Sequence, residues 1–182
     1  MFNSNPSQND RTDSQFVICY SKFTKPMAIS LRNSVPKDKK CVIWSKKEYY
    51  ANEGRLTNAN KILLLHEDLI SENLANPYLK PVTFSDGILV KQEDNTIGIY
   101  VDPDTELISF KSQFKESWKK YVSGMVLPVI LVGGIPGASL ATYLFFLSDR
   151  KKVKFRLLFD AINKFAKDGE IEKFLNGENI DK

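Results

Sequence analysis

Polar side chains able to bind a small ligand follow three apolar runs of this sequence. The runs are F-V-I-C-Y, C-V-I-W and I-L-L-L, and each is typical of a buried strand. The polar pairs that follow them are Ser21–Lys22, Ser45–Lys46 and His66–Glu67. In open α/β sheets, ligands bind beyond the carboxyl ends of the strands, and a helix N-terminus attracts phosphate. These six residues therefore predict a site for a phosphorylated small molecule.

Other catalytic and metal chemistry lacks its required residues. A P-loop needs Lys and then Ser or Thr after its glycines, but V-G-G-I-P-G-A-S-L-A has Leu140 and Ala141 there. A nucleophile elbow at Ser139 needs a later histidine, and the one histidine, His66, precedes it. Structural zinc needs more ligands than one histidine and two distant cysteines. We expect no catalytic residue, metal or cofactor, which favours a protein that is not an enzyme.

The elements needed to position the polar pairs form an α/β domain over residues 16–101. The three apolar runs predict parallel strands covered on both faces. Helices are predicted between them, over 24–33 and from the S-x-x-E capping box at Ser45. The runs 87–90 and 97–101 flank K-Q-E-D-N-T and predict a β-hairpin. The predicted fold class is thus a small three-layer, mainly parallel sheet with a β-hairpin extension.

The rest of the chain divides into further segments. Residues 1–15 have almost no apolar content and predict a disordered lead-in. Residues 102–123 predict an amphipathic helix that begins at Asp102–Pro103; its apolar stripe is Leu107, Phe110, Phe114, Trp118 and Tyr121. Residues 149–182 predict a basic amphipathic C-terminal helix and tail, with the stripe Phe155, Leu158, Ile162 and Phe165.

The apolar segment 124–148 carries the strongest functional signal. Met125 to Leu147 are 23 residues without a charge, and a bilayer core requires about 20 apolar residues. We expect lipid contact through Val126, Leu127, Ile130, Leu131, Leu140, Leu144, Phe145, Phe146 and Leu147. The cations that follow suit anionic lipid headgroups; they are Arg150, Lys151, Lys152 and Lys154. Gly133, Gly137 and Ala141 have the spacing that allows self-association of helices.

Two interpretations of this segment are open. It could contact lipid as a single span or as a re-entrant hairpin, with a break in the glycine- and proline-rich stretch 133–137. It could instead be a buried strand over 126–132 followed by a buried helix over 138–147. A helix covering a sheet should be polar on one side, and L-A-T-Y-L-F-F-L is apolar all round. This favours the membrane.

The function predicted from the sequence is a membrane-associated, non-catalytic binding or signalling module whose main domain is cytoplasmic. The alternative is a soluble α/β domain that binds a nucleotide or another phosphorylated small molecule at its strand ends, and that could be an enzyme. The net charge of +4 is too small to indicate nucleic-acid binding. Cys19 and Cys41 lie in apolar runs, so we expect buried, reduced thiols on strands, not bonded to each other.

Overall fold

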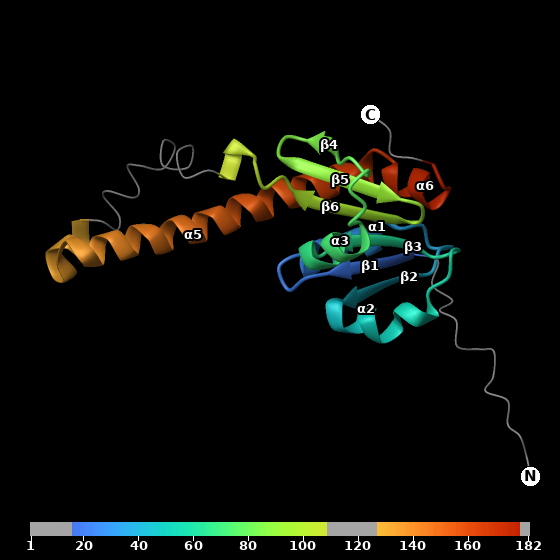
Figure 1. The fold of residues 1–182 in the computed structure, drawn as a ribbon, viewed down its shortest axis with the longest axis horizontal. Helices are drawn as coiled ribbons and strands as arrows, with labels where there is room; N and C mark the ends of the chain where they lie inside the picture. The colour runs from blue at the N-terminus through green and yellow to red at the C-terminus, as the bar shows by residue number, and fades with distance from the viewer. Residues whose placement is uncertain (1–15, 109–126, 179–182) are drawn as a thin grey trace, which may run out of the picture. The chain divides into compact units, whose positions relative to one another are not determined.

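A computed structural model describes residues 16–108 and 127–178 of the chain, without the side chains of 108 and 127–146. The strands are β1 (Phe16–Tyr20), β2 (Cys41–Ser45), β3 (Lys61–Leu65), β4 (Val82–Ser85), β5 (Ile88–Glu93) and β6 (Thr96–Val101). The helices are α1 (Lys25–Ser34), α2 (Lys46–Asn52), α3 (Glu67–Asn73), α5 (Leu127–Lys167) and α6 (Glu170–Leu175), with short 3₁₀ turns η1 (Glu53–Arg55) and η2 (Glu106–Ile108). Figure 1 shows these elements along the chain.

The strands form one mixed sheet in the order β2-β1-β3-β6-β5-β4. β1 pairs in parallel with β2 on one side and with β3 on the other, and β3 pairs in parallel with β6. β4 and β5 are antiparallel. The expected α/β class, with a mainly parallel sheet and a hairpin, is therefore confirmed. The hairpin strands β5 and β6 are longer than predicted, because the turn is only Asp94–Asn95; Asp94 has a φ of 46°.

Two compact units make up the chain. Among the described residues, the first comprises 16–100 and 159–178, and the second comprises 101–108 and 127–158. The C-terminal end of α5 and all of α6 therefore belong to the α/β unit, although the sequence placed them in a separate segment. The α/β unit is thus assembled from two parts of the chain that lie far apart in sequence.

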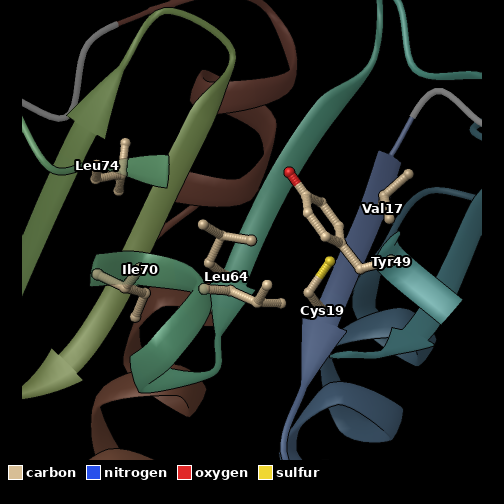
Figure 2. Close-up of a cluster of buried hydrophobic side chains, with 7 residues drawn as sticks. Val17, Cys19, Tyr49, Leu64, Ile70 and Leu74 are labelled. Carbon is tan, nitrogen blue, oxygen red and sulfur yellow. The ribbon is translucent and has the colours of Figure 1, made fainter. Parts of the chain in front are cut away.

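One face of the sheet is covered by α2 and α3. β2 and β3 lie on opposite sides of β1, and because parallel crossovers are right-handed, α1 and α2 fall on opposite faces. The buried cluster on the α2–α3 face is Val17, Cys19, Tyr49, Leu64, Leu69, Ile70 and Leu74 (Figure 2). A Cβ placed on Gly98 of β6 would lie 2.9 Å from Ile70 Cγ1, so α3 packs directly on this glycine.

The C-terminal part of the chain joins α1 in covering the other face of the sheet, behind the strands in Figure 2. The Phe174 ring of α6 meets the Phe16 ring of β1 edge-on, with centroids 6.1 Å apart. The Phe165 ring of α5 meets the Phe84 ring of β4 in the same way, at 5.8 Å. Phe165 and Phe174 are fully buried. The predicted C-terminal stripe is therefore real at Leu158, Ile162 and Phe165, which are all buried, while Phe155 is half-buried.

The backbone of α5 is one helix from Leu127 to Lys167. The predicted break at 133–137 is therefore wrong, and so is the alternative of a strand over 126–132. Pro136 removes one backbone donor, and the bonds of the adjoining turns are enough to continue the helix through it. Within the described residues, no helix combines the length and the apolar character that crossing a membrane requires.

Three further predictions concern the helix from Asp102, the N-terminal lead-in and the two cysteines. Residues 103–105 form a turn and η2 follows, so the α-helix predicted from Asp102–Pro103 does not begin there. Most of its apolar stripe, Phe110 to Tyr121, lies outside the described residues, as does the lead-in 1–15. Cys19 and Cys41 are free thiols on strands; Cys19 is buried as expected, and Cys41 is only half-buried because β2 is an edge strand.

Candidate ligand site at the carboxyl edge of the sheet

The three predicted polar pairs lie at one edge of the sheet. Residues Tyr20, Ser45 and Leu65 are in register across β1, β2 and β3, so the pairs follow or include neighbouring strand ends. The direction of strand succession reverses between β1 and β3, which is the kind of place where open α/β sheets bind ligands. The structure therefore places the three predicted polar pairs close to one another at this edge.

A loop of paired hydroxyls links the ends of β1 and β3. The backbone N–H of Ser21 donates to Thr24 Oγ1 at 2.9 Å, and the backbone N–H of Thr24 donates to Ser21 Oγ at 3.2 Å. Thr24 Oγ1 also donates to the carbonyl oxygen of Leu65 at 2.9 Å. Thr24 is buried, although its sequence position predicted only a residue near the start of a helix. The hydroxyl of Ser21 is thus engaged in the loop, while Lys22 next to it is exposed.

The N-terminus of α2 is capped by the chain itself. Ser45 is the N-cap, its backbone N–H donates to Glu48 Oε2 at 2.6 Å, and its Oγ accepts from the backbone N–H of Glu48 at 3.4 Å. The bond from the Ser45 backbone holds the pKa of Glu48 below its usual value. The predicted capping box is confirmed. A carboxylate therefore occupies the position that a phosphate would take at this helix end.

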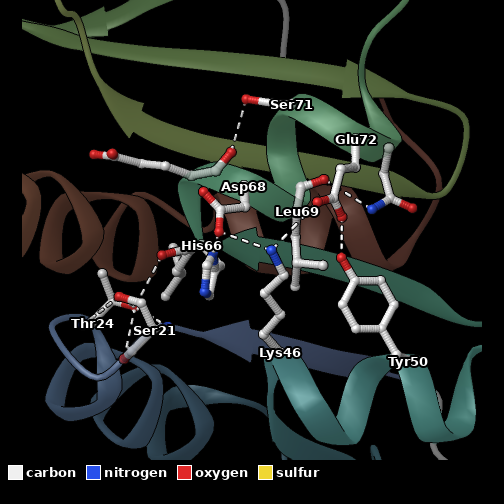
Figure 3. Close-up of polar contacts among 12 residues, drawn as sticks. Ser21, Thr24, Lys46, Tyr50, His66, Asp68, Leu69, Ser71 and Glu72 are labelled. Carbon is white, nitrogen blue, oxygen red and sulfur yellow. Dashed lines mark hydrogen bonds and ion pairs between the residues drawn. The ribbon is translucent and has the colours of Figure 1, made fainter.

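Lys46 bridges α2 to α3 (Figure 3). Its Nζ lies 2.8 Å from Asp68 Oδ2 and 3.3 Å from Glu72 Oε1. The hydrogen bond to Asp68 raises the pKa of Lys46 above its usual value, and the same bond lowers that of Asp68. Tyr50 donates its hydroxyl to Glu72, which lowers the pKa of Glu72. The Lys46 ammonium, which was predicted to bind a ligand, is therefore neutralised by two carboxylates of the protein.

His66 is the one residue at this edge with an unused buried atom. It occupies the N-cap of α3 without capping the helix, and its Nδ1 lies 4.0 Å from Asp68 Oδ2. Among the residues that the structure describes, Nδ1 is the only buried side-chain nitrogen or oxygen without a hydrogen bond. Glu67 beside it is exposed. The edge therefore holds more carboxylates than free cations, which opposes binding of a phosphate.

A pocket of about 370 Å³ opens at the opposite edge of the same unit, where β3 and β6 begin. The hydroxyl of Tyr49 donates to Asn73 Oδ1 at 2.8 Å on its wall, and burial raises the pKa of Tyr49 to about 12. Glu53, Glu93 and Asp94 supply carboxylates to the lining. This pocket was not predicted from the sequence because its lining comes from separate segments of the chain. The polar run T-N-A-N before β3 was the available signal.

Comparison with known proteins identifies no relative: no family model, no curated protein and no solved structure matches this chain.

Proposed function

We propose that the protein is a membrane-associated, non-catalytic binding or signalling module, in which an α/β domain attaches to lipid through α5. The observation that carries the proposal is the 23-residue stretch without a charge, Met125 to Leu147. From Leu127 onward this stretch is part of a continuous helix. Burying an uncharged, largely apolar stretch of this kind in lipid removes a large apolar area from water.

The cations that follow the stretch support the same proposal. Arg150, Lys151 and Lys152 are exposed on α5, and the Nζ of Lys152 is 3.6 Å from Asp149 Oδ1. Lys154 is half-buried on the same helix. Exposed cations next to an apolar stretch lie where anionic headgroups meet the hydrocarbon region, and each contributes about 1 kcal/mol near such a surface.

The test is flotation of the full chain with vesicles of equal parts phosphatidylcholine and phosphatidylglycerol. The wild-type protein should float with the vesicles, and the double variant Leu144→Asp, Phe145→Asp should stay at the bottom of the gradient. Tyr78→Asp, at a residue that is 90% exposed, is the matched control and should float like the wild type. Replacing Arg150, Lys151 and Lys152 by Gln should weaken binding by about 1 kcal/mol per charge. A wild-type chain that never floats contradicts the proposal.

A second candidate is ligand binding at the carboxyl edge of the sheet. The reversal of strand order between β1 and β3, together with the unbonded Nδ1 of His66, favours it. The chain has one histidine, so its imidazole signals in an NMR spectrum report this edge alone. Inorganic phosphate should leave those signals unchanged if the surrounding carboxylates exclude anions. A saturable shift would favour this candidate.

A further inference from the structure

We infer that the protein attaches to one leaflet of a membrane without crossing it, so that both flanks of the apolar stretch lie on the same side. This inference rests on the proposed function. It concerns the way α5 meets lipid, which the composition of the stretch leaves open. The interaction surface it assigns is the stretch 127–147, and the partner is a single lipid surface.

The construction of the α/β unit carries the inference. Residues up to Tyr100 and residues from Phe159 belong to the same compact unit, and the apolar stretch lies between them in the chain. The two parts share a core: Phe174 contacts Phe16, Phe165 contacts Phe84, and the ammonium of Lys61 lies 5.3 Å from the centre of the Phe174 ring. A single crossing between the two parts would place them on opposite sides of the bilayer. The core could not then form.

A second crossing would be needed to bring the chain back, and no segment is suited to it. Before the stretch, residues 107–126 contain Lys111, Lys115, Glu116, Lys119 and Lys120. A lysine at the centre of a membrane helix costs about 2.5–3.5 kcal/mol, so this segment would not insert. After the stretch, only residues 148–158 precede the α/β unit, and about 20 residues are needed to cross.

A turn of the chain inside the bilayer also conflicts with the structure of α5. A re-entrant hairpin needs a break near the middle of the stretch, and α5 is helical through 133–137. The remaining arrangement is a helix that lies along the membrane surface, with the basic residues that follow it at headgroup level. The cations on both flanks fit this arrangement, because each flank then faces the same anionic surface.

The experiment labels one position in each part of the α/β unit. Tyr78→Cys and Glu172→Cys introduce thiols at exposed sites on either side of the stretch in sequence. Each full-length variant is synthesised in the presence of closed vesicles of equal parts phosphatidylcholine and phosphatidylglycerol, floated, and treated with a membrane-impermeant maleimide. The native thiols are the background, which the parent chain measures.

One-sided attachment predicts equal labelling of the two introduced thiols in closed vesicles, with no increase when detergent opens them. A chain that crosses once predicts that one thiol is protected until detergent is added, which would overturn the inference and leave the proposed function standing. A chain that does not float overturns the proposed function and the inference with it.

Discussion

The two faces of the central sheet are covered in different ways. The face that carries Cys19 and Leu64 is covered by α2 and α3, which directly follow β2 and β3 in the chain. On the opposite face, α1 directly follows β1, and the chain returns after more than fifty residues to pack Phe165 and Phe174 against the sheet as well. The first face is therefore covered by local helices alone, and the second needs a long-range contact in addition to its local helix α1. Local patterns can predict the first kind of cover and cannot predict the second.

The largest expected effect comes from removing a ring on the long-range face. Phe174→Ala should lower the free energy of unfolding by about 3–5 kcal/mol, because Phe174 is fully buried and contacts Phe16. Glu172→Ala, at an exposed position of the same helix, should change it by less than about 0.5 kcal/mol. Urea denaturation followed by circular dichroism measures both. If the two variants unfold at the same urea concentration, α6 does not cover the sheet.

A smaller effect is expected on the local face, where α3 packs on Gly98. A Cβ there would lie within 3.0 Å of Ile70 and Leu74, so Gly98→Val should cost about 1–3 kcal/mol. Gly54→Ala is the control, since a Cβ on Gly54 would have nothing within 4 Å. That change should be neutral, or stabilising by about 0.4–1 kcal/mol. A fully stable Gly98→Val protein would show that α3 lies further from the sheet.

The ion pairs that join α2 to α3 should make a still smaller contribution, and one that depends on pH. The pKa values of Asp68 and Glu72 are lowered from 3.8 and 4.5 in the folded protein. Their contribution to stability is therefore present at neutral pH and is lost as the pH falls below these values. Lys46→Met should therefore lower the urea midpoint more at pH 7 than at pH 3, where part of the contribution of these carboxylates has been lost. An equal loss at both pH values would assign the role of Lys46 to packing.

The reactivity of the two native thiols reports the burial of each face of the sheet and requires no substitution. Cys41 is in register with Phe16, and Cys19 is three residues further along β1, so the thiols point to opposite faces and cannot form a disulfide. Burial raises the pKa of Cys19 to about 12 and that of Cys41 to about 11. Native protein at pH 8 should react slowly with a thiol reagent, Cys41 before Cys19, and denatured protein should show two thiols. Rapid reaction of Cys19 would contradict its burial.

The difference between the faces also explains what the sequence could predict. The strands 16–20, 41–45 and 61–65 and the capping box of Ser45 and Glu48 are local patterns, and they were predicted almost to the residue. The apolar stripe near Phe165 predicted an amphipathic helix, but its spacing does not indicate that Phe165 contacts Phe84. The strand β4 was missed because P-V-T-F-S is short and begins next to a proline.

The candidate ligand site shows the same limit. The sequence predicted that Ser21, Lys46 and His66 lie at one edge, because the carboxyl ends of parallel strands lie at the same edge of a sheet. It could not show that Lys46 is paired with Asp68, which lies 22 residues later in the chain. That contact depends on how α2 and α3 pack on the sheet. Residue types therefore predicted the location of the polar cluster, and only the packing reveals which charges remain available.

The two-part construction of the α/β unit also sets the order of events during synthesis. The sheet is complete once Val101 has been made, but the part of the chain that joins α1 on the second face begins only at Phe159. At about 5–20 residues per second, the nascent chain waits roughly 3–12 s for that cover. During this interval the Phe16–Phe174 and Phe84–Phe165 contacts cannot form, and the uncharged stretch is synthesised. The last contacts of the α/β unit therefore form only after the whole uncharged stretch has been synthesised.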